Sequence, residues 1–238
     1  MKRFYKETAV DAGDGGFRVL LDGRPMRTPA KAVLVVPTEP LAGAIADEWR
    51  AVPEKAEINV SHLGFTRLAA TGLDRVADQR QRVIDDTAKY AASDLVCYRA
   101  TDPPSLVQRQ HELWQPLLDW LDEHYGARLV VTTGLTFVSQ PADARATLRQ
   151  AVAAHGDLAL SALYNLTHIA GSLAIALALS EGRLSATDAF AAAQLDELYQ
   201  IERWGEDPIA TQRHQNIRRD LEAGTRFLAL LGHARLKG

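Results

Sequence analysis

The chain has 238 residues, of which 47% are hydrophobic and 24% charged, and its formal net charge is −3. This usage is that of a globular protein and excludes disorder as the main state, and the length allows one large domain or two modest ones. A net negative chain lacks the basic footprint of a general nucleic-acid binder, so we expect no nucleic-acid partner. The single cysteine, Cys97, excludes an internal disulfide and a cysteine-only metal cage.

The N-terminus is basic, but no apolar run of signal-peptide length follows it. We therefore expect a cytosolic protein, or a mature form that has already been trimmed. One stretch, residues 158–179, approaches the ~20 residues that a membrane-spanning helix needs. Because it carries Asn165, Thr167 and His168 and lacks flanking basic loops, it predicts a buried central helix and no integral membrane segment.

The first third of the chain has the pattern of strands and turns. Residues 4–10 and 17–21 are short apolar or alternating runs, and the segment between them is rich in Asp and Gly, which predicts a hairpin. Residues 26–29 and 33–36 can add short strands. Residues 41–51 then have apolar side chains at helical spacing, and Pro53 ends that helix.

Beyond residue 58 the pattern is helical. Apolar spacing predicts an amphipathic helix over 74–93, and a helix over 105–125 in which Pro116 marks a kink or the start of a second helix. Three more helices are predicted over 158–180, 186–204 and 208–231, with a strand or extended connector over 129–138. The predicted fold class is α+β: a small β-rich N-terminal domain with one helix, residues 1–57, followed by a larger all-helical C-terminal domain, residues 58–238.

Standard catalytic and metal motifs are absent from the sequence. There is no phosphate-binding loop and no nucleophile elbow, and the zinc-protease-like start at His111 has Gln115 where the second histidine would stand. Cys97 lies in an apolar run, which predicts a raised thiol pKa. The seven histidines lack ligand spacing, so no metal site is expected, and His168 is expected to be a buried histidine bonded to a carbonyl group.

A charged segment around Trp204 is the strongest candidate for binding. It places Glu197, Glu202, Glu206 and Asp207 around one tryptophan at a helix end. An exposed ring flanked by carboxylates suits an interface anchor. The alternative, weighed equally, is that Trp204 covers the core while the carboxylates serve the helix dipoles.

A basic turn over residues 21–29 carries Arg24 and Arg27. Residue type alone favours a turn with two solvated arginines. A tight basic turn could also meet an acidic partner, but it specifies no substrate.

An ordered set of segments resembles one family over nearly the whole chain. The segments are Phe4-Tyr5-Lys6, the run from Leu21-Asp22-Gly23-Arg24-Pro25 to Thr28-Pro29, Ile45-Ala46-Asp47-Glu48-Trp49, Asp94-Leu95-Val96-Cys97-Tyr98-Arg99-Ala100, Gly171-Ser172, and Leu195 through Trp204-Gly205. Together they are similar to the ATP-twelve family, the chaperones that bind the alpha subunit of F-type ATP synthase during assembly of its catalytic head. Residues 60–66 depart from the Met-Pro-containing form of the family, which affects the expected loop geometry.

The resemblance implies a chaperone that is not an enzyme, has no cofactor and shields the free alpha subunit until the beta subunit replaces it. Burying an aggregation-prone interface in a transient complex is physically coherent. Contact with the alpha subunit is then expected at Glu197, Glu202, Trp204, Glu206 and Asp207. A monomer is expected, in the bacterial cytoplasm or, for a mature organellar form, in the mitochondrial matrix.

Two other classes of protein stay open at this point. One is an enzyme whose site is assembled in the interdomain cleft from scattered residues, such as Arg24, Arg27, His62 and Asp94. A deep polar pocket with convergent titratable groups would favour it. The other is a scaffold subunit that forms a permanent complex.

Overall fold

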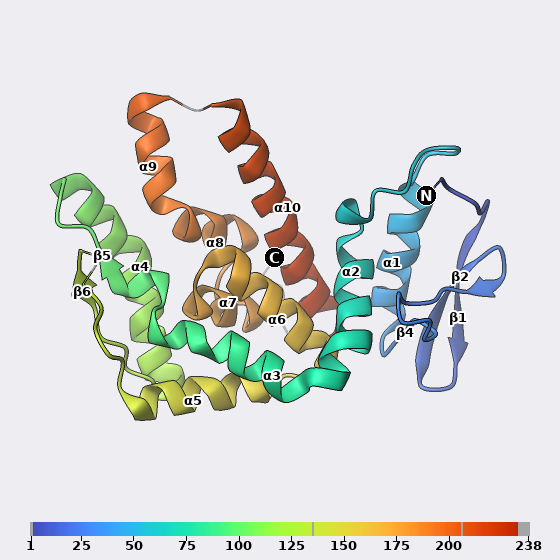
Figure 1. Cartoon of the computed structure of the whole chain (residues 1–238), viewed down its shortest axis with the longest axis horizontal. Helices are drawn as coiled ribbons and strands as arrows, with labels where there is room; N and C mark the ends of the chain where they lie inside the picture. The colour runs from blue at the N-terminus through green and yellow to red at the C-terminus, as the bar shows by residue number, and fades with distance from the viewer. Residues whose placement is uncertain (1, 135, 206, 233–238) are drawn as a thin grey trace.

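The computed structural model describes residues 2–134, 136–205 and 207–232 (Figure 1). Its N-terminal part is a small sheet with one helix. Strands β1 (Thr8–Gly13) and β2 (Gly16–Leu21) form an antiparallel hairpin, and both β3 (Arg24–Pro25) and β4 (Val35–Val36) pair with β2. The hairpin prediction is confirmed, although β1 begins later and runs further than the apolar pattern suggested.

Helix α1 (Glu39–Ala51) packs against β1 and β2, and its prediction is confirmed. Leu41, Ile45 and Trp49 repeat at helical spacing and are buried, so one stripe of the helix faces the sheet. The Trp49 carbonyl accepts a hydrogen bond from the Tyr5 hydroxyl at 2.5 Å, which fixes the N-terminal segment to the end of this helix.

The centre of the helical part is the pair α6 (Asp157–Ala170) and α7 (Leu173–Ser180). All eight residues of α7 are buried, which explains the apolar stretch of residues 158–179 without a membrane. The single predicted helix over 158–180 is wrong in one respect, because Gly171 adopts φ 65° and breaks it. The Ser172 hydroxyl then caps α7 by accepting from the Ile175 N–H at 3.1 Å.

The predicted helix over 186–204 is also two helices. It breaks at Gln194 into α8 (Ala186–Ala193) and α9 (Leu195–Trp204). The last helix, α10 (Pro208–Leu230), ends within one residue of its prediction. Its Gly224 lies so close to α6 that an added Cβ would come within 2.7 Å of Leu166.

The remaining helices surround this centre (Figure 1). Pro116 lies inside a single uninterrupted helix, and the predicted helix over 74–93 is instead a π-helical turn, an α-helix and a 3-10 turn. A two-residue parallel pair shows that the C-terminal part is not purely helical. The elements are α2 (Gly64–Thr71), η2 (Gly72–Val76), α3 (Ala77–Ala88), η3 (Lys89–Ala92), α4 (Pro104–Tyr125), α5 (Ala142–Ala153), β5 (Tyr98–Arg99) and β6 (Thr132–Thr133), with 3-10 turns η1 (Val60–His62) and η4 (Leu95–Cys97).

Side chains join the N-terminal part to the helices. The Trp49 indole N–H donates to the Thr66 hydroxyl at 2.9 Å, and the Glu48 carboxylate accepts from the Phe65 and Thr66 N–H groups at the start of α2. Burial raises the pKa of Glu48, while these hydrogen bonds favour its charged form. The Thr38 hydroxyl donates to the carbonyl of Leu230, at the far end of the chain, at 2.7 Å.

Candidate functional site

Helices α9 and α10 form a hairpin that extends from the helical body (Figure 1). Helix α9 ends because Gly205 adopts φ 87°, which an L side chain rarely takes. Helix α10 begins at Pro208, where a missing N–H costs nothing. The chain therefore reverses direction within a few residues, and the two helix ends form a tip.

Two large apolar side chains stand on this tip in water. Trp204, the last residue of α9, is 77% exposed, and Ile209, in the first turn of α10, is 83% exposed. These are the highest exposures among the large hydrophobic residues of the described chain. Trp204 thus does not cover the core, and exposed apolar side chains among charged residues are the composition of a binding surface.

Glu202 lies below the tip and ties α9 to α4. Its Oε2 is 2.7 Å from Nη1 of Arg109, and both side chains are about half exposed. The same arginine lies over the ring of Tyr199, whose hydroxyl is 2.6 Å from that of Ser105 on α4. The Glu202 carboxylate is accessible from solvent but already has a cationic partner.

Glu197 lies deeper and ties α9 to α10. It forms an ion pair with Arg213, and its Oε1 is 3.2 Å from Nε2 of the buried His214. Glu197, Arg213, Gln194 and Ile217 also line a cavity of about 340 Å³ at the foot of the hairpin. Glu197 thus holds the two helices at their present separation.

Asp207 caps α10. Its Oδ1 accepts hydrogen bonds from the N–H groups of Ile209 at 2.8 Å and Ala210 at 2.9 Å. These bonds satisfy two of the donors that a helix N-terminus leaves free and place a negative charge at the positive end of the helix dipole. Glu206, the fifth predicted site residue, lies outside the described residues.

The structure does not gather the four residues of the alternative enzyme site. Arg24 and Arg27 line one pocket, whereas His62 lines another. Asp94 is fully buried, where it accepts from the N–H groups of Ala174 and Val96. The interdomain arrangement proposed from the sequence is therefore wrong for this set.

Other predictions about chemistry can be checked against the described residues. Burial and the nearby Asp94 raise the pKa of the Cys97 thiol to about 12, as its apolar run indicated. The prediction for His168 is wrong: its ring is exposed, and its Nδ1 lies 3.0 Å from the Tyr90 hydroxyl. Within the described chain, no three His, Cys, Asp or Glu side chains are placed to hold a metal, and no helix is long and apolar enough to cross a membrane.

Ile209 is the site residue that the sequence analysis missed. It follows Asp207-Pro208 directly, in the first turn of the helix, and lies apart from the apolar positions that begin at Ile217. An apolar residue outside the buried stripe of its helix, and only a few residues from a tryptophan, could have indicated an exposed apolar surface. The predicted helices over 186–204 and 208–231 imply a turn between them, but which side chains of their ends stay exposed is visible only in the structure.

A helical body that bears exposed large apolar side chains at the tip of a hairpin has the surface of a protein-binding factor. Residues 2–122, half of the chain, match the family model described as ATP12 chaperone protein. The chain belongs to the ATP12 family of ATP synthase assembly chaperones. The family resemblance and the α+β fold class expected from the sequence are confirmed.

Solved and curated relatives cover the rest of the chain. Atp12 from Paracoccus denitrificans is 38% identical with a TM-score of 0.89, over 97% of this chain and 98% of that one. A chaperone-like protein from Agrobacterium tumefaciens is 40% identical with a TM-score of 0.91, over 97% and 86%. The mitochondrial protein atp12 of Schizosaccharomyces pombe is 23% identical over 86% of this chain and 74% of its own length.

Proposed function

We propose that this chaperone binds the unassembled alpha subunit of F-type ATP synthase through the tip of the α9–α10 hairpin. The observation that carries the proposal is the exposure of Trp204 and Ile209 together at the tip of a hairpin in a member of this family. Contact is made by Trp204 and Ile209, with Glu202, Glu206 and Asp207 as the charged rim. Glu197 does not contact the alpha subunit but positions α9 against α10 through its ion pair with Arg213.

The energetics favour a transient cap. Burying a tryptophan and an isoleucine removes a few hundred Å² from water, which contributes on the order of several kcal/mol before the entropy cost of association. That is enough to compete with aggregation of an exposed client surface and weak enough for a native subunit to displace the cap. The chain acts by binding alone, as a monomer and without turnover or cofactor.

The proposed location follows from the proposed client. The chain works where the alpha subunit is folded, in the bacterial cytoplasm or in the mitochondrial matrix. The Schizosaccharomyces pombe relative is named as mitochondrial, which supports the second setting for an organellar form.

The test is co-expression with an F-type alpha subunit, followed by size-exclusion chromatography of the soluble fraction. We expect a complex with the native chain and at least about a tenfold loss of affinity with Trp204→Ala/Ile209→Ser, because anchor residues of this kind carry most of the binding energy. The matched control is Phe137→Ser, which removes a 68% exposed aromatic side chain from the connection between α4 and α5.

Two outcomes would overturn the proposal. If the alpha subunit aggregates equally with and without the native chain, the client is wrong. If the tip variant and the Phe137 variant bind equally well, the client is right but the surface is wrong. Unchanged thermal unfolding of both variants shows that the effect belongs to binding.

A further inference from the structure

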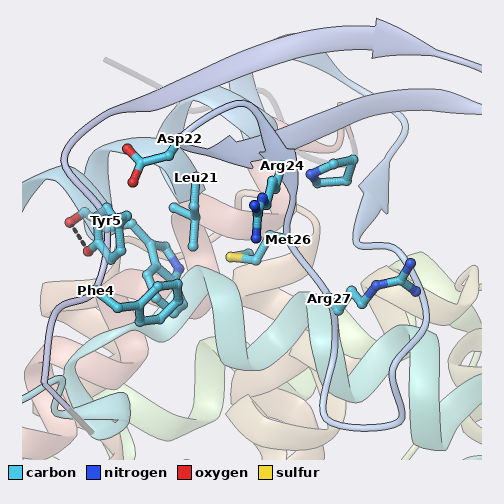
Figure 2. A pocket seen from close by; sticks show the side chains of 9 residues that line it. Phe4, Tyr5, Leu21, Asp22, Arg24, Met26 and Arg27 are labelled. Atoms are coloured by element: carbon cyan, nitrogen blue, oxygen red, sulfur yellow. Dashed lines mark hydrogen bonds between the residues drawn. The ribbon is translucent and has the colours of Figure 1, made fainter.

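The N-terminal part carries a second surface feature that the hairpin tip does not explain. A pocket of about 610 Å³ has Leu21, Met26 and Trp49 in its apolar lining, with the exposed Phe4 at its rim. Figure 2 shows Phe4 and Tyr5 on one side of this pocket and Arg24 and Met26 on the other. Its size is that of a site for a small ligand or several peptide residues.

A second pocket of about 510 Å³ continues the first towards the helical body. The two share Arg27 and Trp49, and the second extends past Val60 to Arg75 in η2. We call the joined pockets the arginine groove and define it by Arg24, Arg27, Arg75, Met26, Trp49 and Val60. It passes from the sheet onto the helices, so an occupant would touch both parts of the chain.

The carboxylates of the groove are already satisfied by neutral donors. Asp22 accepts from the N–H groups of Lys6 and Glu7, both at 2.9 Å, and these hydrogen bonds lower its pKa. Asp74 accepts from the Thr28 hydroxyl at 2.6 Å and the Ala30 N–H at 2.9 Å. Neither carboxylate forms an ion pair with an arginine of the groove.

The arginines consequently lack acidic partners among the described residues. Within the described chain the Arg24 guanidinium has no hydrogen bond or ion pair, and the Arg27 guanidinium donates only to the Lys31 carbonyl, at 2.7 Å. Arg75 lies 5.7 Å from the Tyr164 ring centroid and has no ion pair in the same described region. Elsewhere in the described chain, by contrast, several exposed arginines pair with carboxylates, as Arg109 does with Glu202 at 2.7 Å.

The backbone beside the groove is not available for strand addition. Pro25 of β3 has no N–H group. The next residue, Met26, donates to the Val19 carbonyl at 2.8 Å, and its own carbonyl accepts from Leu34 at 2.9 Å. Recognition in the groove must therefore come from side chains: guanidinium groups that match carboxylates, and an apolar floor.

We propose that the arginine groove binds an extended acidic segment of the protein client, with its carboxylates against Arg24, Arg27 and Arg75 and its apolar side chains over Met26 and Trp49. The inference rests on the proposed function only in taking the occupant to be part of a client protein. It adds a contact on the N-terminal side of the molecule, whereas the tip lies on the last two helices (Figure 1). The charge complementarity carries it: the groove is locally cationic in a chain of net charge −3.

The test uses the whole chain and a fluorescein-labelled peptide of about 12 residues, which spans about 40 Å when extended and in which Glu alternates with Leu and Ser. Fluorescence anisotropy should show saturable binding that weakens as salt is raised. A peptide with Lys in place of Glu should not bind. In Arg24→Glu/Arg75→Glu we expect the affinity to fall at least tenfold, because two attractive contacts become repulsive.

The matched control is Arg82→Glu/Arg145→Glu, which makes the same change of charge on exposed positions of α3 and α5 outside the groove. Its affinity should stay within about twofold of the native value, since the charges lie outside the site. An equal loss of peptide affinity in both double variants would mean that net charge alone causes the effect, and it would overturn the proposal. So would failure of the native chain to bind the acidic peptide, or tight binding of inorganic polyphosphate or single-stranded RNA in its place.

The same two double variants, tested in the alpha-subunit co-expression, separate this inference from the proposed function. If the complex forms and only the tip variant weakens it, the groove is not a client contact and the inference fails while the function stands. If no complex forms but the groove binds the acidic peptide through its arginines, the function fails and the chemistry of the groove stands.

Discussion

The two ends of helix α10 use apolar residues in opposite ways. At its C-terminal end Gly224, Phe227 and Leu228 are buried against the central helices, with Gly224 in close contact with Leu166. At its N-terminal end Ile209 is 83% exposed, and Trp204, at the end of the preceding helix, is 77% exposed. The C-terminal half of α10 therefore contributes to stability, whereas its N-terminal end leaves apolar surface available for binding. Substitutions at the C-terminal end should change the free energy of unfolding, and substitutions at the N-terminal end should change binding.

The largest expected effect on stability is at the buried end. Gly224→Val would force a branched side chain against Leu166, which is fully buried, and we expect a loss of about 2–3 kcal/mol in the free energy of unfolding. The control is Gly43→Ala in α1, where an added Cβ meets nothing within 4 Å. That change should be neutral or stabilising by up to about 1 kcal/mol, because alanine favours helix. Urea denaturation measures both, and equal effects would refute the close packing.

Two aspartates sharpen the comparison, because each caps a helix in a different environment. Asp94 caps α7 inside the body, and burial raises its pKa from 3.8 to about 6. Since the folded-state pKa is the higher one, the folded chain binds the proton more tightly than the unfolded chain. The stability that this proton gives is complete below about pH 4 and is lost as the pH rises through 6.

The measurement compares the native chain with Asp94→Asn, which does not titrate at this position, by urea denaturation at pH 5 and pH 7. Relative to the variant, the native chain should lose about 1 kcal/mol between these two values. Taking the difference between the two proteins removes the titration of all other groups. A difference that is flat, or that rises with pH, would show that the hydrogen bonds to Asp94 outweigh its burial.

The exposed cap should give the smallest effect. Asp207→Ala removes the acceptor for the Ile209 and Ala210 N–H groups, and we expect a loss of about 1 kcal/mol or less, confined to the first turn of α10. Hydrogen exchange at these two amides should speed up several-fold, whereas Asp207→Asn keeps an acceptor and should stay near the native rate. A loss spread over the whole helix would mean that the tip supports the body after all.

Sequence reasoning succeeded where one local pattern decides the structure. The Asp-Gly-rich segment between two apolar runs gave the β1–β2 hairpin, and Asp207-Pro208 gave the start of α10. It failed where a single residue decides between continuation and a break. Gly171 and Gln194 each interrupt a helix-favouring run, and the left-handed conformation of Gly171 depends on packing that spacing does not report.

The candidate site shows the same division. Trp204 and its carboxylates were visible as an unusual cluster, and their positions on a turn could be inferred from Gly205 and Asp207. Ile209 and the ion pairs of Glu197 and Glu202 required three-dimensional neighbours on α10 and α4. The arginines of the basic turn looked solvated from their type alone, and only the two pockets show that they line a surface with Arg75.

The hydrogen bond from Thr38 to the Leu230 carbonyl spans 192 positions of the chain. Helix α10 also contacts α1 and α2, so the first helices meet surface supplied by the last one. During synthesis the packing of the N-terminal part can therefore be completed only after α10 has left the ribosome, and long-range contacts of this kind slow folding. Until α10 can pack, this chaperone therefore exposes apolar surface of its own, as does the unassembled subunit that it is proposed to bind.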